Sequence, residues 1–249
     1  MKGIVLAAGY ATRLYPLTKD RPKPLLPVAG RPIIDYIVDE MDTLPELDQI
    51  IVVTNHRFAS AFESWAEERN QTGAKPVVVV DDQTTDDSNK LGAIGDIQFC
   101  IDRLGIDDDL LIIAGDNLFT YRLKDAHDFF RRYQEDTLLA RRVNPPEDLT
   151  RYAIAELDAD GRVLSLEEKP KQPKSDIAVF ATYFYRRDTV PLIARYLGEG
   201  HSPDAPGHFP AWLYQRKPVR VYLFDGLCID IGTPQSYAEV QETFRPVRD

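Results

Sequence analysis

The sequence predicts an α/β protein with a mostly parallel, doubly wound mixed sheet, joined in its second half by a strand-rich α+β extension. Two observations predict this class. Short apolar runs that end in turn residues alternate with amphipathic segments over residues 1–135. Such alternation is typical of parallel sheets wound by helices, with ligands at the carboxyl ends of the strands. From residue 136 onward, strand-like segments follow one another with few helices between them.

In the first half, the apolar run from Lys2 to Ala8 ends at Gly9 and predicts a buried strand that enters a loop. Pro32 then opens a segment whose apolar positions recur at helical spacing. The same cycle of strand and helix repeats along the chain. We expect further strands at 49–54, 75–80 and 110–114, and helices at 33–41, 58–68, 91–104 and 123–133.

In the second half, the turn sequence Asp158–Gly161 between two strand-like segments predicts a hairpin. The Pro, Asp and Gly-rich stretch 198–207 predicts a loop. We expect a single domain over 1–249, with a nucleotide-binding half at 1–135 and an acceptor-binding half at 136–249. Strands are expected at 137–142, 152–157, 163–168, 178–186, 219–224 and 227–231, and helices at 190–197 and 234–244.

Composition and charge limit the partners. The net charge of −10 argues against a nucleic-acid or anionic-membrane surface, because those partners need a broad positive field. No apolar run approaches the roughly 18 residues of a membrane span, and the first apolar run is too short for a signal peptide, so we expect a cytoplasmic protein. Two cysteines predict neither a disulfide framework nor a zinc cluster, so a metal would have oxygen ligands.

The amino-terminal segment has the opposite charge from the rest. Residues 1–31 contain six basic residues and one acid, a net charge of +5. A basic segment on an acidic protein predicts a local site for a small polyanion, such as the phosphates of a nucleotide.

The segment after the first strand is the most informative. Small residues there let backbone N–H groups approach an anion, and Arg13 and Lys23 add positive charge. A tight turn with two solvated cations is the alternative interpretation. The loop lacks both the dinucleotide fingerprint and the P-loop Gly-Lys-Ser/Thr, which disfavours a dehydrogenase or a P-loop ATPase. The residues expected at the phosphates are Leu6, Ala7, Ala8, Gly9, Tyr10, Ala11 and Thr12.

Two aspartates are candidate metal ligands. Asp116 follows a buried strand that ends in Gly115, a position that suits a ligand facing phosphates, although an Asp there can also form a turn or cap a helix. Asp230 lies inside an apolar strand, where an unpaired carboxylate would be costly to bury. It therefore needs a cation, either a metal or a neighbouring Lys or Arg.

Four segments, in order, resemble the sugar-phosphate nucleotidylyltransferases. They are Leu6–Arg13 followed by Lys23-Pro24, Gly115-Asp116-Asn117, Glu168-Lys169-Pro170, and Asp230-Ile-Gly-Thr-Pro234. The resemblance implies a Rossmann-like nucleotidyltransferase fold. It also implies that Mg²⁺ binds Asp116 and Asp230. On the side of the acceptor substrate, it implies that Glu168 accepts a hydrogen bond from a sugar hydroxyl and that Lys169 binds the sugar phosphate. Arg13 and Lys23 would then act on the triphosphate as the catalytic cations.

This sequence departs from the family pattern at two positions. Ala11 stands where the family has a glycine, so a positive φ would be less comfortable there, and Cys228 stands where it has Trp. The segment 81–95 would read the base in the resembling families. Gln83, Asn89 and Gly92 are its candidate nucleotide contacts, although the two amides can equally be turn residues. The choice among dTTP, UTP and CTP stays open.

The predicted reaction transfers a nucleoside monophosphate from a nucleoside triphosphate to a sugar 1-phosphate, giving an NDP-sugar and pyrophosphate by Mg²⁺-assisted in-line displacement. One alternative is transfer to an alditol phosphate or phosphocholine. A metal-dependent glycosyltransferase is disfavoured because Asp116 is followed by Asn117 and Leu118 rather than completing Asp-x-Asp. A non-catalytic sugar-nucleotide sensor is disfavoured by the intact charged residues. Homo-oligomerisation stays open.

Overall fold

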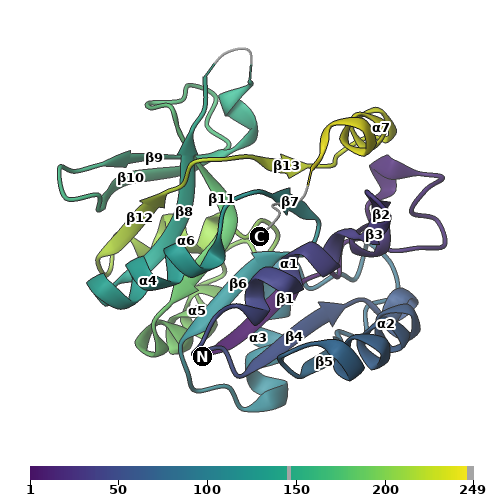
Figure 1. The fold of residues 1–249 in the computed structure, drawn as a ribbon. Coiled ribbons are helices and arrows are strands. Elements are labelled where there is room, and N and C mark those ends of the chain that lie inside the picture. Colours follow the sequence, from purple (N-terminus) through teal and green to yellow (C-terminus); the bar gives the residue numbers. More distant parts are fainter. Residues whose placement is uncertain (145–146, 246–249) are drawn as a thin grey trace. The chain divides into compact units, whose positions relative to one another are not determined.

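The computed structural model describes residues 1–144 and 147–245, and Figure 1 shows its helices and strands. The chain groups into two compact units. Unit 1 consists of Met1–Lys90, Ala114–Lys124 and the chain from Gly226 onward, and unit 2 consists of Leu91–Ile113 and Asp125–Asp225. Single-domain organisation stays a prediction.

Unit 1 contains a parallel sheet of the predicted kind. Strand β4 (Gln49–Thr54) pairs in parallel with β1 (Lys2–Leu6) and with β5 (Val77–Asp81). The two helices predicted between these strands are confirmed as α1 (Ile33–Asp42) and α2 (Ala59–Thr72). Helix α1 packs closely on β1, since a Cβ on Gly3 would come 2.3 Å from Met41 Cε.

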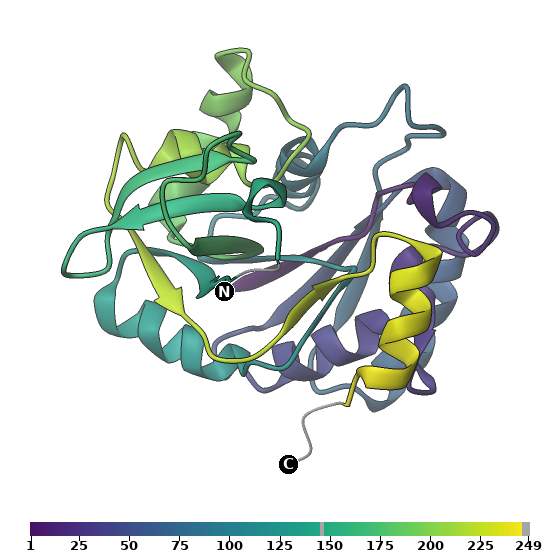
Figure 2. The ribbon, with the colours of Figure 1, turned by 90° about the horizontal axis from the view of Figure 1, so that it is seen from above.

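Two short antiparallel pairs complete the strands described in unit 1. The first joins β7 (Asn117–Phe119) to β13 (Cys228–Asp230), and the second joins β2 (Pro27–Val28) to β3 (Arg31–Pro32). Helix α7 (Pro234–Thr243) begins with a capping box formed by Thr233 and Ser236. It lies beside the β2–β3 hairpin in Figure 2, where Tyr237 Oη donates to the Pro27 carbonyl at 2.6 Å. Short 3₁₀ turns occur at η1 (Thr12–Leu14), η2 (Lys23–Leu25) and η3 (His56–Phe58).

Unit 2 is rich in antiparallel strands, as the second half of the sequence predicted. The long strand β11 (Ile177–Tyr185) pairs antiparallel with β6 (Leu110–Ala114), β8 (Asp136–Arg142) and β9 (Ala153–Leu157). Strand β12 (Val219–Leu223) joins β8 in parallel. The other elements are β10 (Val163–Glu168), α3 (Ala93–Leu104), α4 (Leu123–Tyr133), α5 (Val190–Gly198), α6 (His208–Leu213), η4 (Leu149–Arg151) and η5 (Arg187–Thr189).

The predicted hairpin at Asp158–Gly161 is confirmed. It joins β9 to β10, which pair antiparallel. Asp158 Oδ1 accepts hydrogen bonds from the backbone N–H groups of Asp160 and Arg162, and Gly161 takes a positive φ of 80°.

The predicted fold class is confirmed: the protein is α/β, with parallel strands wound by helices in the amino-terminal segment and a strand-rich extension after it. The buried apolar side chains come mainly from strands and from the inward faces of helices, including Ile4, Val52, Ile112 and Phe184. Within the described residues, no helix is both long and apolar enough to cross a bilayer.

Candidate active site

The loop that follows β1 is held by the end of β4. The Ala7 N–H donates to the Val53 carbonyl at 2.9 Å, and the Asn55 amide donates to the Ala8 carbonyl at 2.9 Å. Gly9 is exposed, and a Cβ placed on it would meet nothing within 4 Å. The loop is therefore fixed on the side of the sheet and open at Gly9.

Sequence reasoning did not identify Asn55. Its Oδ1 also accepts from the Phe58 N–H at 3.2 Å, so one buried amide both caps η3 and holds the loop. The available signal was its position, directly after a predicted strand and at the carboxyl end of the sheet.

Ala11 adopts the left-handed conformation that glycine would adopt most easily. Its φ is 47° and its ψ is 42°, and its carbonyl accepts a hydrogen bond from Thr18 Oγ1 at 2.8 Å. A positive φ is less comfortable for alanine than for the glycine that the family has at this position, yet Ala11 adopts it. Arg13 lies two residues later in η1 and is exposed to solvent.

Lys23 and Asp116 form an ion pair. Lys23 is only 5% exposed, and its Nζ lies 2.8 Å from Asp116 Oδ2. The residue before Asp116, Gly115, lies close to the end of β1: its N–H donates to the Leu6 carbonyl at 2.9 Å. A Cβ on Gly115 would lie 2.9 Å from the same oxygen, so glycine allows this close contact. The turn that carries Asp116 thus lies against the start of the loop from Leu6 to Thr12, the predicted phosphate loop.

The backbone brings the two predicted metal ligands to neighbouring positions. In the antiparallel pair of β7 and β13, Asp230 lies opposite Asn117, the residue next to Asp116. The resemblance implied that these two aspartates, about 110 residues apart in the sequence, bind one Mg²⁺. The pairing of the two short strands brings their backbones to neighbouring positions.

The segment that would read the base packs against the phosphate loop. Thr84 Oγ1 lies 3.3 Å from Tyr10 Oη, and the Thr84 carbonyl accepts from the His56 N–H at 2.9 Å. Gln83 has a φ of 65°, its N–H donates to Asp81 Oδ1 at 2.7 Å, and it is exposed. Gln83 therefore stands next to the loop with its side chain toward solvent.

The amide of Asn89 is used within its own turn. Its Oδ1 accepts from the N–H groups of Thr85 and Asp86, both at 3.1 Å, and its Nδ2 donates to Thr85 Oγ1 at 3.2 Å. Of the two interpretations that the sequence left open for Asn89, these contacts favour the turn residue.

Gly92, in unit 2, begins helix α3 with a positive φ of 79°. A Cβ there would lie 2.7 Å from the Pro203 carbonyl oxygen. The next two N–H groups, of Ala93 and Ile94, donate to the carbonyls of Asp204 and Pro203. The start of α3 is thus capped by the loop 199–207.

The predicted acceptor residues lie at the end of β10 in unit 2. Glu168 has a side chain only 13% exposed, whereas the Lys169 side chain is 61% exposed, and their charged atoms are 3.7 Å apart. Lys169 has a φ of 49°, and its N–H donates to the Tyr152 carbonyl at 3.0 Å. Burial raises the pKa of the Tyr183 phenol, and the nearby charge of Glu168 raises it further.

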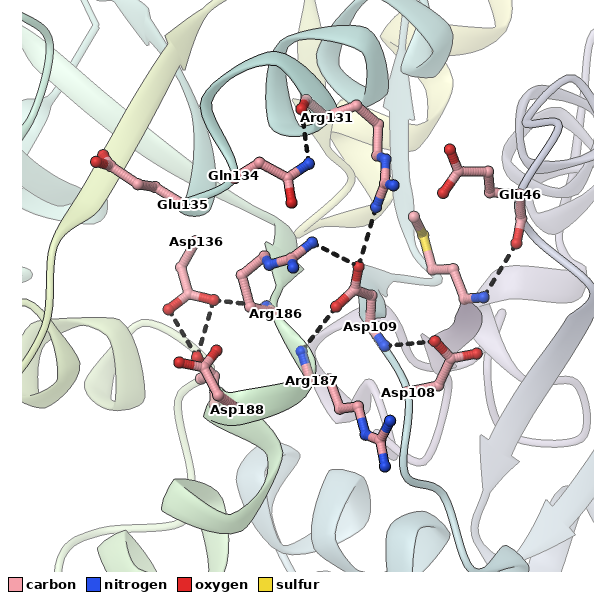
Figure 3. Close-up of polar contacts among 12 residues, drawn as sticks. Glu46, Asp108, Asp109, Arg131, Gln134, Glu135, Asp136, Arg186, Arg187 and Asp188 are labelled. Carbon is pink, nitrogen blue, oxygen red and sulfur yellow. Dashed lines mark hydrogen bonds and ion pairs between the residues drawn. The ribbon is translucent and has the colours of Figure 1, made fainter.

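A separate cavity of about 660 Å³ in unit 2 contains none of the predicted site residues. Figure 3 shows that Arg186, which lines this cavity, is bound by neighbouring carboxylates: Asp109 accepts from the guanidinium groups of Arg131 and Arg186, and buried Asp136 accepts from the Arg186 N–H. Burial raises the pKa of Asp136, and the Lys217 ammonium opposes that rise. The residues that line the cavity are Asp107, Gln134, Glu135, Arg186, Arg187, Asp188, Pro191, Lys217 and Pro218.

The structure thus brings the phosphate loop, Lys23, Asp116 and the base segment together in unit 1, where strand pairing also places the Asp230 backbone beside Asn117. Gly92, Glu168 and Lys169 belong to unit 2. Apart from Gly92, three of the predicted residues, Ala11, Gln83 and Lys169, have positive φ values. Strained backbone of this kind is concentrated at functional sites.

Comparisons with known proteins find relatives that match nearly the whole of this chain. The glucose-1-phosphate thymidylyltransferase of Neisseria gonorrhoeae is 34% identical over 265 residues, which cover 100% of this chain and 84% of that protein. A protein of Sulfolobus acidocaldarius that carries the name mannose-1-phosphate guanyltransferase is 29% identical over 96% of this chain. The chain spans only 62% of the length of that relative.

A solved structure has the same fold. A crystal structure from Bacillus anthracis, described as a glucose-1-phosphate thymidylyltransferase in complex with sucrose, superimposes with a TM-score of 0.81 at 26% identity and covers 100% of this chain and 97% of that one. The family model named nucleotidyl transferase matches residues 2–245. The chain therefore belongs to the nucleotidyl transferase family, among the sugar-1-phosphate nucleotidylyltransferases.

Proposed function

We propose that the chain transfers a nucleoside monophosphate from a nucleoside triphosphate to a sugar 1-phosphate, with release of pyrophosphate. The observation that carries the proposal is the convergence in unit 1 of the small-residue loop, the buried Lys23 and the carboxylate of Asp116. Backbone N–H groups and a fixed cation bind phosphates, and a carboxylate beside them suits a divalent metal.

The proposed reaction does not require a side chain to act as a general base. The nucleophile is an oxygen of the sugar phosphate, which is already ionised at neutral pH, and it attacks the α-phosphorus while pyrophosphate leaves. Catalysis then depends on alignment and charge neutralisation. In this proposal the loop from Leu6 to Thr12 and the exposed Arg13 bind the triphosphate, and Lys23 places its ammonium between that phosphate chain and Asp116.

Two carboxylates beside the substrate phosphates would suit Mg²⁺. This ion is usually held by one or two carboxylates together with substrate phosphates rather than by a cage of protein ligands. Asp116 and Asp230 would hold it, since the strand pairing brings them to neighbouring positions. When bound there, Mg²⁺ supplies positive charge that reduces the repulsion between the two anionic substrates.

The acceptor side of the proposal belongs to unit 2. Glu168, whose carboxylate is mostly buried, would accept a hydrogen bond from a sugar hydroxyl, and the exposed Lys169 would bind the acceptor phosphate. Backbone turns with positive φ set the direction of both Lys169 and Gln83, and Gln83 would contact the edge of the base.

The relatives suggest which substrates to test first. Since a relative covered over 84% of its length is named glucose-1-phosphate thymidylyltransferase, we propose dTTP and glucose 1-phosphate ahead of UTP, CTP and other acceptors. We further propose that the protein works in the cytoplasm on these small molecules rather than on nucleic acid or membranes.

A pyrophosphate-release assay over a matrix of triphosphates and phosphorylated acceptors, with Mg²⁺, tests the proposal. We expect release that requires both a triphosphate and a sugar 1-phosphate. Release that requires an alditol phosphate or phosphocholine instead would support the other acceptor class. No release with any pair, together with sugar transfer from an NDP-sugar, would favour a glycosyltransferase, and binding without turnover would favour a sensor.

A further inference from the structure

Gly207 lies directly against the carboxylate of Glu168 in unit 2. A Cβ placed on Gly207 would come 2.0 Å from Glu168 Oε2, 3.0 Å from its Cδ and 3.4 Å from the Cβ of Ala153. The first distance is far shorter than any non-bonded carbon–oxygen contact, so one of the two groups would have to move. The carboxylate of Glu168 therefore occupies the space that any other residue at 207 would fill.

The backbone does not require glycine at this position. Gly207 has φ −70° and ψ −15°, the ordinary right-handed helical conformation that every L-residue adopts. Glycine is the residue that leaves room here, and the group that uses the room is the Glu168 carboxylate. The position thus differs from Gly92, where φ is positive.

The chain around Gly207 is anchored, so the backbone cannot easily withdraw. The Ser202 carbonyl accepts from Tyr196 Oη at 2.6 Å, and the Pro203 carbonyl accepts from the Ile94 N–H at 2.9 Å. Glu199, at the start of the same loop, accepts from Trp212 Nε1 at 3.0 Å. Gly207 itself is buried, and its carbonyl accepts from the Ala211 N–H at 3.3 Å in the first turn of α6.

Glu168 is the more mobile partner. Its side chain ends in a carboxylate that can rotate, whereas the Gly207 backbone is fixed by its neighbours. A methyl group at 207 would consequently turn the carboxylate out of its present position. We infer that Gly207 is a positioning residue for acceptor recognition: it leaves the space in which Glu168 presents its carboxylate to a sugar hydroxyl. This inference rests on the proposed function.

The test compares two glycine-to-alanine substitutions in the full chain. Gly207→Ala should raise the KM for the sugar phosphate about 10- to 100-fold, the equivalent of losing a hydrogen bond to a charged group, while the KM for the triphosphate stays the same. Gly198→Ala is the matched control, because a Cβ at the end of α5 would meet nothing within 4 Å. It should leave both constants unchanged.

A double-mutant cycle separates positioning from general disruption. In a Glu168→Ala background, Gly207→Ala should raise the acceptor KM no further, because the carboxylate it displaces is gone. If Gly207→Ala fails to fold, the same double variant should recover the folded yield.

Three results would overturn the inference: a Gly207→Ala acceptor KM equal to that of the wild type, additive effects in the cycle, or a folding defect that persists without Glu168. These results differ from failure of the proposed function, in which the wild type itself releases no pyrophosphate with any acceptor. That outcome would remove the inference together with the function.

Discussion

Replacing Ala11 by glycine should stabilise the protein, although glycine usually destabilises. Alanine at φ 47° carries a steric cost of roughly 1–2 kcal/mol in the left-handed region, and glycine carries almost none. Glycine also gains freedom in the unfolded chain, which costs about 0.5–1 kcal/mol. The difference leaves Ala11→Gly more stable by about 0.5–1 kcal/mol, or about 1–4 °C in the unfolding midpoint of a chain of this size.

Thermal and urea unfolding of matched variants measure this gain. Ala29 also has a left-handed backbone, with φ 48°, but lies in the β2–β3 turn, so Ala29→Gly should show a similar gain without any role at the phosphates. Ala61 lies inside helix α2, and Ala61→Gly should lose about 0.5–1 kcal/mol. Triphosphate binding should be retained in Ala11→Gly, because the backbone conformation that presents the loop N–H groups is unchanged.

A loss of stability in Ala11→Gly similar to that of Ala61→Gly would refute the reasoning. It would mean that the alanine methyl group contributes packing worth more than the left-handed strain. A gain in stability accompanied by loss of triphosphate binding would contradict the expectation that binding is retained, since binding would then depend on the methyl group of Ala11 itself.

The remaining predictions concern charged groups. Asp230→Asn should keep the fold but lower turnover by several powers of ten, because a metal centre supplies several kcal/mol of charge stabilisation; a near wild-type rate would refute the ligand assignment. Lys169→Ala should raise the acceptor KM and Lys23→Ala should weaken triphosphate binding by calorimetry, each by roughly 1.5–3 kcal/mol, and equal weakening of triphosphate binding by both would show that the roles are not divided. Two arginines, at 162 and 220, lower the pKa of Glu135 in the folded protein. The ionised Glu135 therefore contributes to the free energy of unfolding above about pH 4.3, and this contribution is lost as the pH falls through the lowered folded-state pKa. The cost of Glu135→Gln, about 1–2 kcal/mol at pH 7 in urea unfolding, should therefore shrink below about pH 4, and a cost independent of pH would contradict the assignment.

Periodicity predicted the main elements because their apolar patterns reflect burial. The strand predicted at 49–54 has the same ends as the observed strand, and the helix predicted at 33–41 stops one residue before the observed end of α1 at Asp42. The three-residue strand at 117–119 was missed, since a strand this short has no periodicity of its own and exists because β13 pairs with it. The predicted strand at 227–231 was expected among the strands of the extension, but it joins β7 in a separate pair.

The candidate site was predictable where local sequence carries the chemistry and not where it depends on tertiary packing. The loop after β1, Lys23 and Asp116 follow from residue types at a strand end. The ion pair between Lys23 and Asp116 joins residues 93 positions apart, and no local pattern indicates it. Gly207 likewise has no signal in the sequence, because its importance comes from the side chain of Glu168 that packs on it.

The central claim is that an oxygen of the sugar phosphate forms the new bond to the α-phosphorus of the triphosphate, so that the nucleotidyl group, and not the sugar, is transferred. Sugar 1-phosphate labelled with ¹⁸O in its phosphate group, incubated with an unlabelled triphosphate and Mg²⁺, tests this claim by mass spectrometry of both products. The proposed reaction predicts that all of the label is recovered in the NDP-sugar and that the pyrophosphate is unlabelled. Label in released phosphate or pyrophosphate, or an NDP-sugar without label, would contradict it.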